Sequence, residues 1–293
     1  MINIKNLTKI FSPDVIAVNN LTINVKQGVN GLVGENGAGK STLMRLIADV
    51  YDIDQGQILI DGVSHTDKEA KNNLFYLSDS PYFNKNSTAY ETAVLYSSLF
   101  EMDLDKYTSL FNKLSLPLNR KISTFSKGMR RQMFLCIALS MKAKYLLLDE
   151  AFDGLDPLIQ EIVKEEINIL AKEKTIVLSS HNLASLQGLC NNFIILSKGK
   201  FKKEGSAQDL GKQYTKYQIL FNTSVREEDL KNIGVNVISF KQIGSIVHIV
   251  IDSESDAEII KEKYNPQIIE KISLENDEII ALQILLSKKG DNE

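Results

Sequence analysis

The sequence GENGAGKS at residues 34–41 decides the fold of this chain. It matches the pattern G-x-x-x-x-G-K-[ST], follows the apolar pair Leu32-Val33 and precedes an apolar, helix-like run at 43–50. Glycine tolerates positive φ angles, so the backbone N–H groups of such a loop can approach phosphate oxygens closely. A strand, a glycine-rich loop and a helix in this order predict a nucleoside triphosphate site. A plain glycine-rich turn is the alternative.

The polar residues of this loop suit a triphosphate. Lys40 would place positive charge on the terminal phosphates, and Ser41 would offer a hydroxyl to Mg²⁺. A helix that begins near Ser41 directs its positive N-terminal end at an anion. The residues expected to surround the nucleotide are Asn36, Gly37, Ala38, Gly39, Lys40, Ser41 and Thr42.

Outside this loop, buried strands alternate with helical stretches. Apolar runs at 145–148, 176–178 and 193–196 predict fully buried strands, and 158–170 has helical spacing. Such alternation predicts an α/β fold with a mainly parallel sheet covered on both faces. The region is expected to end at Gly199. Short strands are expected near the N-terminus, and the stretch 86–122 is helix-rich.

The texture of the chain changes after Gly205. The elements expected there are, in order, a strand at 217–221, a helix at 225–232, strands at 237–242 and 246–251, a helix at 256–264, a strand at 268–272 and a helix at 275–286. This order contains the split β-α-β pattern. A length of 293 residues also favours one main domain plus a smaller one. We therefore expect a domain at 1–205 and an α+β extension at 206–293.

Composition limits the class of function. The net charge of -3 suggests no general attraction to nucleic acid. Cys136 and Cys190 have neither metal-ligand spacing nor a disulfide framework, which fits a reducing compartment. The N-terminus lacks a signal pattern, and no apolar run approaches the roughly 18 residues needed to cross a bilayer. We expect a cytoplasmic protein that reaches a membrane only through a partner.

Four further segments downstream of the loop suit a nucleotide site, and each also has an ordinary structural interpretation. Asp149 and Glu150 end a predicted buried strand, the edge where doubly wound sheets place ligands. Ser126 precedes a helical run and would also serve as a plain helix cap. The tripeptide at 154–156 precedes a proline suited to open a helix. His181 follows the strand at 176–178, where a surface histidine is the alternative.

Taken together, these segments resemble ABC transporter ATPases over residues 1 to about 205. The segment 125–129, FSKGM, is the most family-specific, although Lys127 and Met129 replace the commonest glycine and glutamine. The resemblance implies a P-loop NTPase with an N-terminal antiparallel β subdomain and a helical subdomain at about 82–140. The cofactors it implies are ATP and Mg²⁺.

The resemblance also implies residue roles. Asp149 would hold Mg²⁺ together with Ser41, and Glu150 would polarise the attacking water. His181 would contact the γ-phosphate and link it to the catalytic carboxylate. Catalysis would thus depend on Glu150, His181 and Lys40. Ser126 and Gly128 would bind the γ-phosphate held by a second subunit, and Asp156 would lie in the loop at the seam between the subunits.

Two positions are less regular. Asp79 stands where the family usually has a glutamine that touches Mg²⁺ or water. A carboxylate still accepts from water or approaches Mg²⁺, but it cannot donate as an amide does. Phe11 stands where the family stacks an aromatic ring on adenine. A core residue of the first strand is the alternative for Phe11.

The implied function is ATP hydrolysis coupled to transport. The implied partners are an integral-membrane permease and a second ATPase subunit, either identical or related, on the inner face of the cell membrane. No nucleic-acid partner is expected. The form of 126–129 and the ending at 273–286 resemble exporter systems with a separate permease. Two alternatives are a soluble ABC ATPase acting on ribosomes or DNA, which the single nucleotide domain and missing heptads disfavour, and a non-hydrolysing ATP sensor.

Overall fold

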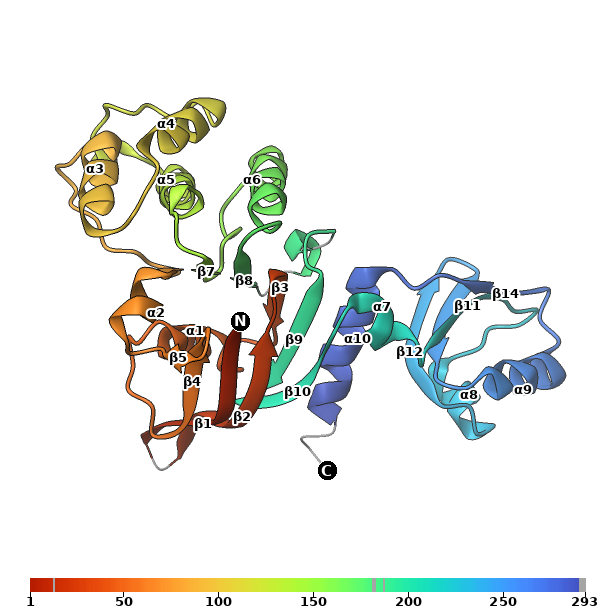
Figure 1. Cartoon of the computed structure of the whole chain (residues 1–293). Helices are drawn as coiled ribbons and strands as arrows, with labels where there is room; N and C mark the ends of the chain where they lie inside the picture. Colours follow the sequence, from red (N-terminus) through yellow and green to blue (C-terminus); the bar gives the residue numbers. More distant parts are fainter. Residues whose placement is uncertain (13, 181–182, 187, 290–293) are drawn as a thin grey trace. The chain divides into compact units, whose positions relative to one another are not determined.

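The computed structural model describes residues 1–12, 14–180, 183–186 and 188–289 (Figure 1). They form two compact units, Met1–Glu204 and Gly205–Glu293. Each unit has its own sheets and its own buried cluster of apolar side chains.

An antiparallel sheet opens the first unit. Its strand order is β2-β1-β4-β5, and the strands are β1 (Ile2–Ser12), β2 (Val15–Val25), β4 (Gln55–Ile60) and β5 (Val63–Ser64). Alternate residues of β1 point inward, so that Ile4 pairs with Ile23 on one side and Ile58 on the other. The antiparallel β subdomain implied by the resemblance is confirmed.

The second sheet of this unit has the order β10-β9-β3-β8-β7-β6. Its strands are β3 (Gly28–Val33), β6 (Leu74–Leu77), β7 (Tyr145–Leu148), β8 (Thr175–Ser179), β9 (Asn192–Ser197) and β10 (Lys200–Gly205). The pairs β3–β8, β3–β9, β7–β8 and β6–β7 are all parallel. The carboxyl ends of β3, β6, β7 and β8 therefore meet at one edge.

Strand β10 corrects the expectation that this region ends at Gly199. Gly199 has a φ of 75° and makes the turn that returns the chain beside β9. The sequence KFKKEG of β10 carries almost no apolar signal, because an edge strand needs little apolar surface.

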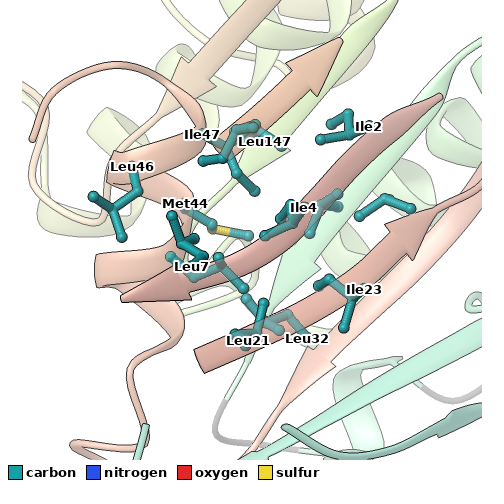
Figure 2. Packing of buried hydrophobic residues seen from close by; sticks show 14 of the residues in the cluster. Ile2, Ile4, Leu7, Leu21, Ile23, Leu32, Met44, Leu46, Ile47 and Leu147 are labelled. Carbon is teal, nitrogen blue, oxygen red and sulfur yellow. The ribbon is translucent and has the colours of Figure 1, made fainter. Parts of the chain in front are cut away.

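Helix α1 (Lys40–Ile47) packs between the two sheets. Figure 2 shows side chains of β1, β2 and α1 meeting in one apolar cluster, among them Ile4, Leu7 and Met44. Leu32 of β3 and Leu147 of β7 join the same cluster from the parallel sheet. Because α1 begins directly after the glycine-rich loop, this packing fixes the loop at the edge of the parallel sheet.

Helices form a further group in the first unit (Figure 1). Its members are α3 (Ala89–Leu99), α4 (Leu104–Lys113) and α5 (Lys127–Ser140). A capping box starts α3: Thr88 Oγ1 accepts from the N–H of Glu91, and the N–H of Thr88 donates to Glu91 Oε2. The remaining helices of this unit are α2 (Lys68–Asn72), α6 (Pro157–Leu170), η1 (Ile122–Thr124) and η2 (Leu183–Leu186).

The second unit contains an antiparallel sheet of order β12-β13-β11-β14. Its elements are α7 (Ala207–Gly211), β11 (Thr215–Leu220), α8 (Glu227–Asn232), β12 (Val237–Ile243), β13 (Ile246–Ile251), α9 (Glu254–Tyr264), β14 (Ile268–Ile272) and α10 (Asn276–Lys289). The predicted order from β11 to α10 is confirmed, whereas α7 was not expected. Leu230 of α8 and Ile260 of α9 pack in one cluster with Ile219 and Ile249 of the sheet.

Candidate functional site

The glycine-rich loop lies at the carboxyl end of β3 in a conformation that requires glycine. Gly34 has a φ of 154° and Gly39 a φ of 97°. A Cβ atom on Gly34 would lie 2.3 Å from the carbonyl oxygen of Leu196, and one on Gly39 would lie 2.3 Å from that of Ala17. The loop is thus closed against β9 and β2. Gly39 is the N-cap of α1 and has no side chain to cap it, so the first N–H groups of the helix face the loop and suit an anion.

The ammonium of Lys40 is enclosed by this loop. The residue is 6% exposed, and Nζ donates to the carbonyl oxygens of Gly34 at 2.7 Å and Glu35 at 3.0 Å. Burial lowers the pKa of Lys40, and the carboxylates of Glu150, Asp149 and Glu35 oppose that shift. Two carbonyl oxygens of the loop therefore face the positive charge of Lys40.

A cluster of oxygen atoms surrounds Asp149 at the end of β7. Asp149 is fully buried, and its Oδ1 accepts from Ser41 Oγ at 3.1 Å and from Ser179 Oγ. Tyr76 donates its hydroxyl to Oδ2 at 3.4 Å, and burial followed by the charge of Asp149 raises the pKa of Tyr76 to about 12. Ser41 and Asp149 therefore present neighbouring hard oxygen ligands, which are the kind that Mg²⁺ prefers.

These ligands fit a Mg²⁺ ion that is completed by phosphates and water. Among the described residues, no three His, Cys, Asp or Glu side chains gather as a metal site of their own. Mg²⁺ is commonly bound by one or two carboxylates together with substrate phosphates, so a hydroxyl and one carboxylate are sufficient protein ligands here.

A cavity of about 590 Å³ joins the loop to Glu150 and Phe11. It brings together the predicted residues Phe11, Asn36, Gly37, Ala38, Gly39, Lys40, Ser41, Thr42 and Glu150. Phe11 is 52% exposed and meets the ring of Tyr51 edge to face, with 5.3 Å between centroids. Phe11 is therefore not a core residue of the first strand, and the alternative interpretation was wrong.

Ser126, Gly128 and Asp156 do not line this cavity in the described part of the chain. Ser126 caps α5, where its Oγ accepts from the N–H of Met129 at 3.1 Å. Its hydroxyl hydrogen stays available to donate elsewhere. A Cβ atom on Gly128 would lie 3.0 Å from the carbonyl oxygen of Gly154, so the start of α5 lies against that loop. Asp156 caps α6 through the N–H of Ile159 at 3.0 Å.

Two predicted residues have a different status. His181 lies outside the described residues. Asp79 follows β6, and its Oδ1 pairs with Arg45 Nη2 at 3.3 Å, with nearly half of the Asp79 side chain exposed. Asp79 as a metal ligand stays a prediction.

Three side chains that the sequence did not predict also contact the site, namely Tyr76, Arg131 and Ser179. Ser179 ends β8, beside β7, so the rule that carboxyl ends meet at one edge could have found it. Arg131 lies in the polar N-terminal part of α5, next to Arg130, and no sequence pattern singles it out.

A second, larger cavity of about 1090 Å³ lies beside the Asp79 loop. Its lining is largely aromatic and aliphatic and includes Tyr51, Tyr76, Tyr82 and Leu95. Tyr82 is 90% exposed, and Leu95 of α3 is 56% exposed. Solvent-exposed apolar side chains around a cavity mark an interaction surface.

Known proteins resemble this chain in sequence. Residues 18–153 match the family model described as ABC transporter. The lantibiotic transport ATP-binding protein SrtF of Streptococcus pyogenes is 30% identical over 227 residues, which cover 75% of this chain and 98% of SrtF. The ABC transporter ATP-binding protein YtrB of Bacillus subtilis is 26% identical over 88% of both chains.

Solved structures show the same fold. An ATP-binding subunit of an ABC transporter matches with a TM-score of 0.67 and 27% identity over 73% of this chain and 92% of that one. Along the described ranges, we find no helix with the length and apolar character to span a membrane. Family model, relatives and fold agree, and the chain belongs to the ATP-binding proteins of ABC transporters.

Proposed function

We propose that this chain binds ATP with Mg²⁺, hydrolyses the ATP and thereby powers a separate exporter permease. The observation that supports this best is a set of contacts at one edge of the parallel sheet. The glycine-rich loop encloses Lys40, and Ser41 is hydrogen-bonded to Asp149. Glu150 lines the same cavity as Lys40 and Ser41. These are the groups that hydrolysis of a terminal phosphoryl group needs.

In the proposed reaction, the oxygen of a water molecule attacks the γ-phosphorus, the bond to the bridging oxygen breaks, and ADP leaves. Glu150 orients the water and accepts its proton. Lys40 offsets the negative charge on the γ-phosphoryl oxygens, and the start of α1 adds its backbone N–H groups. Mg²⁺, held by Ser41 and Asp149, would neutralise further phosphate charge. The family resemblance supports a role for His181 at the γ-phosphate.

A second subunit, identical or related, would complete each site. Ser126 and Gly128 lie at the N-terminal end of the long helix α5. Among the described residues, neither lines the cavity that contains Lys40. The hydroxyl of Ser126, the N–H of Gly128 and the N-terminal end of α5 suit the γ-phosphate bound by the other subunit. Asp156 would lie at the seam. ATP would then join the two subunits, and hydrolysis would let them separate.

The permease would dock at the cavity of about 1090 Å³. The exposed side chains of Tyr82, Leu95 and Leu99 offer apolar contacts, and Arg45, Lys71 and Glu91 add charge in the same lining. A short segment of a permease with apolar side chains fits such a surface. The proposed location is therefore the cytoplasmic face of the membrane. The relative SrtF is named a lantibiotic transport protein, which supports transport. Export as the direction rests on the form of residues 126–129 and 273–286, which resembles exporter systems.

Two measurements test this proposal. The purified chain should hydrolyse ATP in the presence of Mg²⁺, and the chain in cells should sediment with membranes only when its permease is present. ATP binding without turnover would instead favour a sensor. Sedimentation with ribosomes or DNA, independent of any permease, would favour a soluble machine.

A further inference from the structure

The peptide group between Asp149 and Glu150 is held from both ends by buried side chains. Its N–H, on Glu150, donates to Ser179 Oγ at 2.8 Å. Its carbonyl, on Asp149, accepts from Arg131 Nη2. Ser179 is fully buried and Arg131 is 7% exposed. Two residues from β8 and α5 therefore fix the orientation of one peptide plane directly before the Glu150 side chain.

This peptide needs such support because Glu150 adopts a left-handed backbone conformation, with a φ of 49°. Residues other than glycine, asparagine and aspartate rarely adopt it, and it persists only where surrounding contacts impose it. Arg131 Nε also donates to the carbonyl oxygen of Ala151 at 3.3 Å. The carbonyl oxygens of the two residues on either side of Glu150, Asp149 and Ala151, thus both accept hydrogen bonds from the guanidinium of Arg131.

Arg131 reaches a second loop as well. Its Nη1 donates to the carbonyl oxygen of Ser78 at 2.9 Å and lies 3.5 Å from that of Asp79. The planar guanidinium has a rigid fork of N–H donors, so its position fixes several carbonyls at once. Arg131 therefore connects α5, the loop after β6 and the loop that carries Glu150.

We propose that Ser179 and Arg131 are positioning residues that hold the Glu150 carboxylate in place for hydrolysis. The inference rests on the proposed role of Glu150 in the ATPase reaction. Misplacing a reacting group by about 1 Å can lower a rate about 100-fold. Since Ser126 is the N-cap of α5, Arg131 would also link the γ-phosphate of the other subunit to Glu150 of this one.

The test uses Ser179→Ala and Arg131→Lys in the purified full chain at saturating Mg²⁺. We expect kcat to fall about tenfold to 100-fold in both variants, with KM and the Kd for a fluorescent ATP analogue unchanged. Slow hydrolysis should also let the ATP-bound dimer accumulate, as measured by size-exclusion chromatography. A merely structural defect would do the reverse, because it would weaken ATP binding and lower the dimer fraction.

Ser140→Ala is the matched control. Ser140 is also buried and lies on α5, but its hydroxyl bonds to the carbonyl of Cys136 at 2.7 Å within the helix. Ser179 also donates to the Asp149 carboxylate, whereas the hydrogen bond of Arg131 goes to the Asp149 carbonyl, so the contact common to both variants is the Glu150 peptide. Normal kcat in either variant, or a matching loss in Ser140→Ala, would overturn the inference. An inactive wild-type chain would instead overturn the proposed function, and the inference with it.

Discussion

Ser41 Oγ donates a hydrogen bond of 3.1 Å to Asp149 Oδ1, although the two residues are 108 positions apart in the sequence. The bond joins the start of α1, which follows β3, to the end of β7, and both lie at the carboxyl edge of the parallel sheet. It also puts a hydroxyl and a carboxylate oxygen next to each other at the proposed Mg²⁺ site.

Asp149→Asn should therefore weaken the binding of Mg²⁺ in the presence of ATP. The amide keeps one acceptor oxygen for the hydroxyls of Ser41 and Ser179, but it removes the negative charge that attracts the ion. We expect Mg²⁺ affinity in the presence of ATP to fall at least about tenfold, since even loss of an indirect contact costs that much. Isothermal titration with Mg²⁺ would measure this. An unchanged affinity would remove Asp149 from the site.

Glu150→Gln should separate ATP binding from turnover. The amide has the shape of the carboxylate but cannot accept the proton of the attacking water, and such a group typically contributes about 10²–10⁴-fold in rate. We expect an unchanged Kd for ATP, a loss of turnover in that range and a dimer that persists with ATP. Phosphate release and light scattering would report both effects, and robust turnover would exclude Glu150 as the base.

Gly39→Ala should destabilise the fold more than Gly37→Ala. Both residues have positive φ, 97° and 81°, so alanine is strained at either, by about 1–3 kcal/mol. Only at Gly39 would the new Cβ also meet a backbone atom, 2.3 Å away, whereas nothing lies within 4 Å at Gly37. Urea denaturation would give the two free energies of unfolding. Equal losses would show that strain alone, without the close contact, decides the effect.

Phe11→Ala should weaken ATP binding without lowering stability. Phe11 is half exposed beside the nucleotide cavity, so its removal uncovers little core, whereas stacking of a base on an aromatic ring is worth about 1–3 kcal/mol. Fluorescence titration with an ATP analogue should show the loss, and Phe11→Tyr should restore it. Ile10→Ala is a control, because Ile10 is also exposed but does not line the cavity. An equal effect at both positions would argue against stacking.

Local pattern predicted the residues whose chemistry depends on neighbours in the chain. The loop at 34–41 and the acids after 145–148 carry their own context, because strand, loop and helix are consecutive. Ser179 and Arg131 carry none, since their contacts depend on which strands are neighbours and on where α5 packs. Phe11 was ambiguous because β1 extends past the core, which no periodicity reveals.

Leu95→Asp should weaken binding of the permease and leave the ATPase activity of the isolated chain unchanged. Leu95 is 56% exposed on α3 and lines the cavity of about 1090 Å³ that we assign to permease docking. A carboxylate there would be buried without a partner once the permease binds. Loss of a hot-spot contact in an interface costs about 2 kcal/mol or more, so we expect affinity to fall at least about tenfold. Basal ATPase activity should not change, because Leu95 does not line the nucleotide cavity.

Ile169→Asp provides the matched control for this prediction. Ile169 has the same exposure of 56%, but it lies on α6 and does not line the docking cavity. Copurification of the permease with each variant, from the same membranes, would compare the two surfaces directly. If Ile169→Asp released the permease and Leu95→Asp kept it, the docking surface would lie on α6 instead. If both variants kept it, neither helix face would take part in docking.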